Sequence, residues 1–408
     1  MTAPVQRLRY AWQNSSHPLV TAGHRLVDRD GRPFWPTVRT TFPQQQLSLR
    51  YAGVAEGFAN IVPLLEQLGE PVLGPAHRGP RHSVRRRVLH HPPPADADIL
   101  AVGCRKSLAH RLPGANALVL PFRIHLVVDV DDELEKLRLR ISKRERWEFN
   151  RNRRRSGWTV RVGSRPDDFW FFYRRMHQPT MDARHGERAR TERPDVAFHG
   201  VFRQGFLFFV EQGGHPVAGA LCRLDATTST LTTRLLGVLD GAAEHYASGA
   251  FKAVYHFLLE WCSEHQVEHL DFHGTEAFLA KGIFQWKRKF HPRITLAPNH
   301  HADKRLWLRA TRDTPAVRDF LVANPVLEIA SGTQLRAVWF YDDTRPARSA
   351  ISCGLPGVTE ECHRHLDELL GGLPGPAPQQ SSSQHRPSSG ATSVSLASAA
   401  EGNHDAHL

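Results

Sequence analysis

Residues 246–290 read YASGAFKAVYHFLLEWCSEHQVEHLDFHGTEAFLAKGIFQWKRKF, and this pattern predicts the fold of the second half of the chain. Small residues at 246–250 predict a loop. Apolar residues then recur at helical spacing, which predicts a helix: Phe251, Val254, Leu258, Trp261 and Cys262. A short strand follows at 268–274 and ends in a turn. A second helical run then leads to the basic segment 287–290.

The residues before this stretch predict an antiparallel meander. Segments 206–210, 216–224 and 230–239 are each apolar enough for a strand, and Gly213-Gly214 is suited to a hairpin turn. The first half, from about 24 to 126, carries shorter strand and helix signals. Together these patterns predict an α+β fold with a mixed, largely antiparallel sheet that is flanked by helices.

Composition suggests an anionic partner without identifying one. The chain has 408 residues and a formal net charge of +12, which suits nucleic acid, a membrane surface or a phosphate-bearing cofactor. Only eight of the 53 basic residues are Lys, so a general preference for Arg explains the charge equally well. Five scattered Cys form no Cys-x-x-Cys pair, which argues against a disulfide framework or zinc site. We expect a cytoplasmic protein without a transmembrane segment, because no long apolar run occurs.

Several motifs in one order resemble a known superfamily. The first is the basic run 143–155 before Gly157, and the second is the meander, which contains Pro-Val-Ala-Gly at 216–219. The loop and helix at 246–261, the strand-end turn 270–274 and the helical run with its basic segment at 282–290 follow in that order. In this order, residues 95–295 resemble the Gcn5-related N-acetyltransferase (GNAT) superfamily, in particular the branch related to Fem-type peptidyltransferases and CelD-like acetyltransferase domains. That branch carries a similar Asp-x-x-Gly turn followed by an aromatic-Lys pair. Here His291-Pro292 replaces the Gly pair that often follows.

The resemblance implies two related GNAT-like lobes. We expect a polar N-terminal segment at 1–20, a degenerate GNAT-like lobe at 21–130 and the acyltransferase lobe at 131–300. A C-terminal extension would occupy 301–373. Residues 374–408 are rich in Ser, Gly, Pro, Gln and Ala, which predicts a disordered tail.

The implied chemistry is acyl transfer from a thioester, and it needs a base, an acid and an electrostatic stabiliser. His273 is the candidate base, with help from Asp271, and Tyr246 could protonate the departing thiolate. Lys287 could face a phosphate or the developing oxyanion. Each has a structural alternative: a surface histidine, a packed tyrosine ring and a solvated basic face.

Acetyl-CoA or a longer acyl-CoA is the implied co-substrate, and no metal is expected. A helix N-terminus attracts phosphate, so Ser248, Gly249 and Ala250 are candidate cofactor-binding residues. Arg234 and Gly237 match half of the usual GNAT phosphate signature. A lone Gly before a helix is also an ordinary turn.

Three functions stay open on the sequence. The first is an acyltransferase acting on an amine or hydroxyl of a small molecule, or of a lipid- or nucleotide-linked precursor of the cell envelope or a polysaccharide. The second is an aminoacyl-tRNA-dependent peptidyltransferase of the Fem type, and the third a non-enzymatic nucleic-acid-binding protein. The Arg-rich helix 138–155 could serve phosphates in each case, or be a solvated face. The sequence leaves the acceptor, the acyl length and the oligomeric state open.

Overall fold

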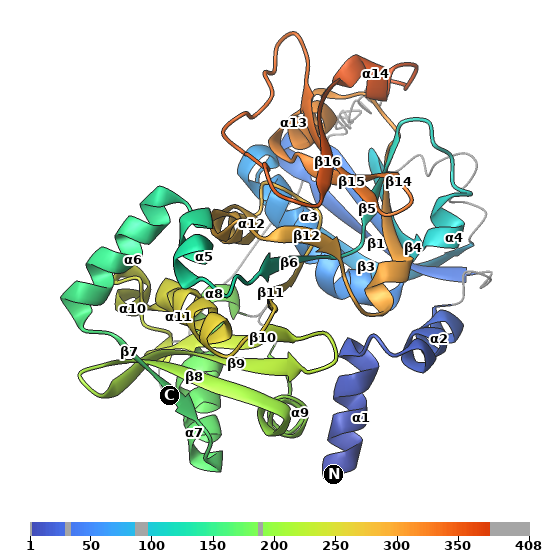
Figure 1. Cartoon of the computed structure of the whole chain (residues 1–408). Helices are drawn as coiled ribbons and strands as arrows, with labels where there is room; N and C mark the ends of the chain where they lie inside the picture. Colours follow the sequence, from blue (N-terminus) through green and yellow to red (C-terminus); the bar gives the residue numbers. More distant parts are fainter. Residues whose placement is uncertain (1, 29–33, 86–96, 187–190, 376–408) are drawn as a thin grey trace, which may run out of the picture. The chain divides into compact units, whose positions relative to one another are not determined.

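The computed structural model describes residues 2–28, 34–85, 97–186 and 191–375 (Figure 1). Two large sheets and one small sheet, with helices packed on them, make up this part of the chain. Each sheet is mixed, and the two large sheets are mostly antiparallel, so the predicted α+β fold is confirmed. The predicted disordered tail falls almost entirely outside the described residues.

The first sheet has six strands in the order β3-β1-β2-β4-β13-β5. In this order the strands are His77–Arg85, Phe34–Phe42, Leu47–Gly53, Ile99–Arg105, Lys304–Ala310 and Ala117–Pro121. Strands β2 and β4 run parallel, and helix α3 (Ala55–Leu73) and strand β3 lie between them in the sequence. Strand β3 lies in a segment that the sequence suggested was an exposed loop; its residues are exposed, and it pairs with β1 as an edge strand.

Helix α3 is longer than its sequence suggests. A stop is expected at Gly69 and Pro71, but the helix continues to Leu73. Gly69 faces the ring of Phe42, where an added Cβ would lie 2.5 Å from the ring. Burial of the apolar face therefore outweighs the helix-breaking tendency of these two residues.

The second sheet has seven strands in the order β12-β6-β11-β10-β9-β8-β7. In this order they are Arg293–Leu296, Ile124–Asp129, His269–Thr275, Thr230–Val238, His215–Asp225, Gly205–Gln212 and Thr159–Gly163. The predicted meander is confirmed as β8, β9 and β10, and Gly213 and Gly214 take positive φ in its turn. Helix α11 (Ala250–Glu264) then leads to β11, which runs parallel to β10.

The two large sheets resemble each other in part of their strand order. In the first, the parallel pair β2 and β4, with α3 and β3 between them in the sequence, is followed by β5, and β13 is inserted between β4 and β5. In the second, a parallel pair joined by α11 is followed by β12, with β6 inserted between β11 and β12. All strands of the second sheet, β6 to β12, therefore form one continuous stretch of the sequence, whereas the first sheet combines β1 to β5 with β13 from beyond that stretch.

A third sheet lies in the segment expected as a C-terminal extension. Its strands are β14 (Val326–Ser331), β15 (Gln334–Tyr341) and β16 (Val358–His365). The helix predicted from about 319 to 329 is wrong in its second half, because α13 (Pro315–Ala323) ends before β14. Strand β14 pairs with β15, and its first three residues, Val326 to Glu328, are all buried.

Helices also form where the sequence shows no pattern. The segment 1–20, expected to be unpatterned, contains α1 (Ala3–Asn14) and the start of α2 (Pro18–Val27). Helix α1 buries Tyr10 against Gly200 of α9 (Pro194–Gly200), where an added Cβ would lie 2.6 Å from the Tyr10 Cβ. This tertiary contact stabilises a helix that has little apolar periodicity of its own.

The Arg-rich helix expected at 138–155 is divided between two helices, α5 (Leu134–Arg140) and α6 (Lys143–Ser156). Ser142 separates them: its side chain caps α6, and its backbone N–H donates to the carbonyl oxygen of Lys289. The other helices follow in chain order: α4 (Lys106–Ala109), α7 (Pro166–Phe171), the π-helical segment η3 (Phe172–His177), α8 (Gln178–His185), α10 (Ala243–Ala247), α12 (Gly282–Lys287) and α14 (Leu366–Leu370).

Helices cover both faces of the second sheet. Helix α11 packs on one face, onto Phe208 and its neighbours (Figure 1). On the opposite face, Leu207 and Phe209 of β8 join an apolar cluster with η3, α9 and Tyr10 of α1. Among the described helices, none combines the length and the apolar character needed to cross a membrane.

Candidate functional site

A cavity of about 510 Å³ lies on the face of the second sheet that α11 does not cover. Alternate residues of the strands line it: Thr232 and Arg234 from β10, Asp271 and His273 from β11, and His125 from β6. Successive side chains of a strand point to opposite faces, so the intervening apolar residues pack toward α11. Helix α1 lines the other side of the cavity.

The cavity lies where β10 and β11 part. Their parallel pairing covers three residue pairs, Thr230 to Thr232 with His269 to Asp271, after which the strands separate. Both strands bulge at this point. Arg234 is the extra residue of β10 against β9, and β11 gains a residue between Asp271 and Gly274 against β6. Bulges re-aim side chains, and here they bring Arg234 and His273 together: Arg234 Nη1 lies 2.5 Å from His273 Nε2.

His125 and Asp271 form a buried pair at this cavity. The His125 Nδ1 lies 2.6 Å from Asp271 Oδ2, and each side chain is about 5% exposed. The other carboxylate oxygen of Asp271 accepts the backbone N–H of His273 at 2.8 Å. A carboxylate beside Nδ1 fixes the tautomer with the proton on Nδ1, which leaves Nε2 as a proton acceptor. No protein partner for this Nε2 is found among the described residues.

His125 was not predicted from the sequence. It comes from β6, a strand of the first half of the chain, and lies 146 residues from Asp271. A signal did exist: His125 is the one polar residue in the run Ile-His-Leu-Val-Val at 124–128. A polar side chain inside a buried strand needs a partner, but the sequence does not say which.

His273, the candidate base, lines the cavity and has an unusual backbone conformation. Its φ of 65° is uncommon for a residue with a side chain. Burial, and then the positive charges of Arg234 and Arg123, lower the pKa of His273 well below its ordinary value. The ring is therefore neutral, and its Nε2 accepts from the Arg234 guanidinium. In this geometry the Nε2 lone pair is engaged by Arg234.

Lys287 is buried rather than part of a solvated basic face. Its side chain is about 6% exposed, and Nζ lies 2.5 Å from the carbonyl oxygen of Phe272, in the β11 bulge. Burial lowers the pKa of Lys287 to about 7; the charge of Asp271 opposes this shift and that of Arg123 adds to it. Lys287 does not line the cavity. It supports the backbone from which Asp271 and His273 project.

Of the residues predicted for phosphate binding, Gly249 lines a second, smaller cavity. It has a volume of about 220 Å³ and lies at the N-terminus of α11, lined by Gly249, Tyr246 and Trp158. Gly249 takes φ 89° as the N-cap, and Ser248 Oγ accepts the N–H of Ala250 at 3.4 Å. The buried Trp158 Nε1 lacks a hydrogen-bond partner within the described part of the chain.

Two predicted residues lie elsewhere than expected. Tyr246 is in α10 rather than in a loop, and it lines the small cavity, whereas His273 lines the large one. Gly237 lines neither cavity. A Cβ on Gly237 would lie 2.5 Å from the backbone of Met176, so this glycine allows η3 to pack closely on β10.

The edge of β10 beyond its pairing with β11 is already hydrogen bonded. Thr180 Oγ1 accepts the N–H of Val238 at 2.9 Å and donates to its carbonyl oxygen at 3.3 Å. His177 Nδ1 lies 2.9 Å from the carbonyl oxygen of Leu236. Side chains of η3 and α8 therefore occupy backbone groups that an extended ligand would need for pairing with this strand.

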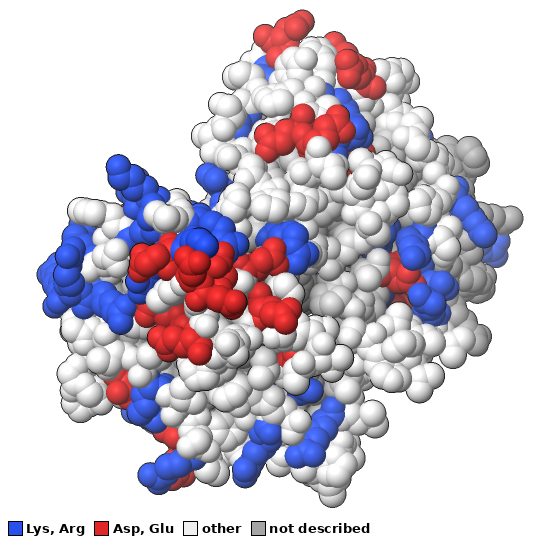
Figure 2. Space-filling view, in the orientation of Figure 1, with Lys and Arg blue, Asp and Glu red and all other residues white. Residues whose placement is uncertain are grey.

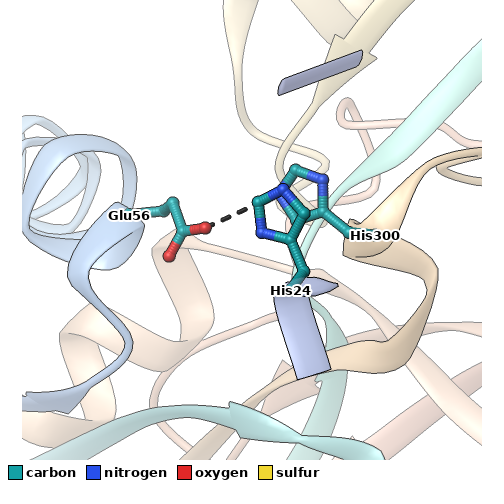
Figure 3. Close-up of side chains that lie close together, drawn as sticks. All are labelled: His24, Glu56 and His300. Atoms are coloured by element: carbon teal, nitrogen blue, oxygen red, sulfur yellow. Dashed lines mark ion pairs between the residues drawn. The ribbon is translucent and has the colours of Figure 1, made fainter. Parts of the chain in front are cut away.

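A separate cluster joins His24, Glu56 and His300 (Figure 3). The two rings stack in parallel, with centroids 3.6 Å apart and planes at 4°, so their lone pairs do not converge on one point. His24 Nε2 also lies 2.7 Å from the carbonyl oxygen of Trp12, and Lys304 Nζ lies 2.6 Å from Glu56 Oε1. This arrangement does not fit a metal ion and instead anchors α2.

No protein-family model matches this chain, and no curated protein sequence matches it. Among solved structures, FemX is 10% identical over 75% of this chain and 96% of its own, with a TM-score of 0.36. L-PGS from Bacillus licheniformis is 12% identical over 78% of this chain and 96% of its own, with a TM-score of 0.35. A GCN5-related N-acetyltransferase from Kribbella flavida is 13% identical over 52% of this chain and 69% of its own, with a TM-score of 0.27. At these TM-scores none of the likenesses transfers a function.

Proposed function

We propose that this chain is an acyltransferase that acylates an amine bound in the large cavity, with His125 as the base. The buried His125–Asp271 pair, placed where β10 and β11 part, carries this proposal. A histidine whose Nδ1 is held by a carboxylate is a suitable general base, because the carboxylate also stabilises the imidazolium that forms. Lys287, through the carbonyl oxygen of Phe272, and His273, through its backbone N–H to Asp271, would hold this pair in place. The ring of His273 would also orient the guanidinium of Arg234.

The reaction balances with these groups. The acceptor nitrogen attacks the thioester carbonyl, an amide C–N bond forms and the C–S bond breaks. The amine proton passes to Nε2 of His125 and then to the departing sulfur. Asp271 keeps its hydrogen bond to Nδ1 throughout, so it holds the ring in place and offsets its positive charge.

Acyl-CoA is the proposed donor. The N-terminus of α11, beside Gly249, carries the partial positive charge of the helix dipole, and the unpartnered Trp158 Nε1 and the ammonium of Lys252 line the same cavity. Glu145 and Glu148 also line it, and Lys252 lies 3.4 and 3.3 Å from them. CoA would supply the activated acyl group, and Ser248, Gly249 and Ala250 would hold its phosphates.

An aminoacyl-tRNA donor is the second candidate, and the occupied edge of β10 favours it. A pantetheine arm carries amides that would pair with free backbone groups, but Thr180 and His177 already bind those of Val238 and Leu236. Arginines also gather on α6, at the left edge of Figure 2. Arg154 and Arg155 are exposed there and would suit RNA phosphates.

Two measurements test these proposals. Thermal shift with CoA, acyl-CoA, tRNA and duplex DNA at two salt concentrations separates the donors. Stabilisation by CoA that persists at moderate salt supports acyl-CoA. Steeply salt-dependent stabilisation by tRNA supports the second candidate, and DNA binding without a CoA response supports a nucleic-acid-binding protein.

The His125→Asn variant tests the base. We expect acyl transfer to fall at least about 100-fold while the thermal unfolding midpoint stays close to that of the wild type. Transfer would be followed as thiol release in the presence of an amine acceptor. Wild-type turnover in His125→Asn, together with loss of turnover in His273→Ala, would return the role of base to His273.

A further inference from the structure

Two arginines line the large cavity next to the ring of Tyr10. Arg223 comes from β9 and Arg234 from β10, and the register pairs Thr232 with Arg223. Their guanidinium carbons lie 5.0 and 5.2 Å from the centroid of the Tyr10 ring. Tyr10 belongs to α1, so the N-terminal helix supplies the aromatic surface on which both cations lie.

Neither arginine has an acidic partner at ion-pair distance among the described residues. Arg223 Nη1 donates to the carbonyl oxygen of Gly200 at 2.5 Å, and Arg234 Nη1 to the neutral ring of His273. The Nε of Arg234 is buried and has no hydrogen-bond partner in the described chain. Glu192 is close enough to feel the charge of Arg234, but no ion pair between them is present.

The acids that line the cavity are committed elsewhere. Asp271 holds His125 and the backbone of His273. Asp225 accepts the N–H of Thr227 at 2.9 Å within its own turn. A third arginine of the lining, Arg293, is paired with Asp129. No described acid therefore forms an ion pair with Arg223 or Arg234, and a partly buried guanidinium without an ion-pair partner favours a ligand that balances its charge.

We propose that the large cavity binds its substrate through an oxyanion, a phosphate or a carboxylate, held by Arg223 and Arg234 beside Tyr10. This rests on the proposed function only in taking the bound molecule to be the acceptor. A guanidinium presents several N–H groups in one plane, which suits the two oxygens of either group. The anion would fix one end of the acceptor and leave its amine to reach His125.

The test is calorimetric titration of the full chain with inorganic phosphate and, separately, with succinate. We expect Arg234→Gln and Arg223→Gln each to weaken binding of the preferred anion about tenfold, as loss of a charged hydrogen bond implies. Arg165→Gln is the matched control: it removes the same charge from a side chain that is 76% exposed and paired with Asp167, and binding should not change. Tyr10→Phe should retain affinity, and Tyr10→Leu should lose part of it.

The separate titrations with phosphate and with succinate identify which group of the acceptor carries the oxyanion. Binding of phosphate but not succinate indicates a phosphorylated acceptor, and the reverse indicates a carboxylate. The proposal is overturned if neither anion binds the wild type, or if the Arg234→Gln and Arg165→Gln proteins bind equally well. Far-ultraviolet circular dichroism confirms that each variant is folded.

The same variants separate this site from the chemistry. His125→Asn should bind the anion like the wild type while losing acyl transfer. If anion binding depends on Arg234 but no acyl transfer occurs with any donor, the anion site stands and the proposed reaction falls. If transfer proceeds and anion binding does not depend on Arg234, the reaction stands and the anion site falls.

Discussion

Burial decides the charge state of the residues around the β11 bulge. Lys287 is isolated from water and donates to the carbonyl oxygen of Phe272, while His273 is kept neutral beside Arg234. For Lys287, the lowered pKa means that the folded state prefers the neutral amine. The same residue therefore links the geometry of the site to the pH dependence of stability.

The lowered pKa of Lys287 predicts how stability varies with pH. Between about 7 and its ordinary value of 10.5, the unfolded chain binds more protons than the folded one at this residue. The contribution of Lys287 to the free energy of unfolding should therefore rise with pH, by about 1.4 kcal/mol per pH unit. Urea unfolding of the wild type and of Lys287→Met should give curves against pH that diverge in this window, with the wild type gaining stability.

The control for this prediction is Lys143→Met, which replaces an exposed lysine of α6. Its unfolding free energy should follow that of the wild type at every pH. If the wild-type and Lys287→Met curves are parallel from pH 7 upward, the amine is not buried as described.

At the scale of elements, the Arg-rich segment serves packing as well as charge. Glu260 of α11 accepts from Arg138 of α5 at 2.8 Å and from Arg153 of α6 at 3.0 Å. Glu145 of α6 is buried and lies 3.4 Å from both Lys252 and Lys289. Two acids thus hold α5 and α6 on α11, and the cations that stay exposed, such as Arg154, cover the outer side of α6 (Figure 2).

Removing the acid that joins three helices should be costly. Glu260 is 13% exposed on its side chain, so Glu260→Ala leaves two half-buried guanidinium groups without their partner. We expect a loss of about 1–3 kcal/mol in the free energy of unfolding, measured by urea denaturation. Glu133→Ala is the control, because Glu133 and its partner Lys136 are both more than 60% exposed. That variant should change stability by less than about 0.5 kcal/mol, and an equal loss in both would contradict the packing role of Glu260.

At the scale of the whole described chain, the first large sheet depends on a strand that follows the second sheet in the sequence. Strand β13 pairs with β4 on one side and β5 on the other, after the chain has formed every strand of the second sheet from β6 to β12. His125 lies on β6, the first of these strands, and reaches Asp271 because β6 pairs with β11. The first sheet is therefore complete only when the chain returns from the second.

A truncation series tests whether the first large sheet depends on β13. A chain of residues 1–300 lacks β13, which leaves the facing edges of β4 and β5 without partners in the middle of a sheet. We expect it to aggregate or to lose the cooperative thermal transition, as followed by circular dichroism. A chain of residues 1–375 keeps every described strand and should melt like the full chain. A cooperative, soluble 1–300 protein would show that the second sheet folds independently.

Much of the second half of the fold could be predicted because its signals are local. The apolar spacing at 251–264, the meander and the Gly213-Gly214 turn each depend on residues close in sequence. The structure brings the candidate base His273 and Asp271 to one cavity, together with Arg234, which the sequence placed among the candidate cofactor-binding residues. Tyr246 and Gly249 lie at another, and Gly237 serves packing. Their predicted roles stay predictions.

By itself, the sequence determined the α+β class, the meander β8–β10, helix α11 and strand β11. Tertiary structure decided the rest: the pairing of His125 with Asp271, the burial of Lys287 and the insertion of β13 between β4 and β5. The physical reason is the separation along the sequence over which each effect acts. Helical periodicity and turn residues act over a few positions, whereas strand partners, burial and pKa depend on segments that folding brings together from far apart in the chain.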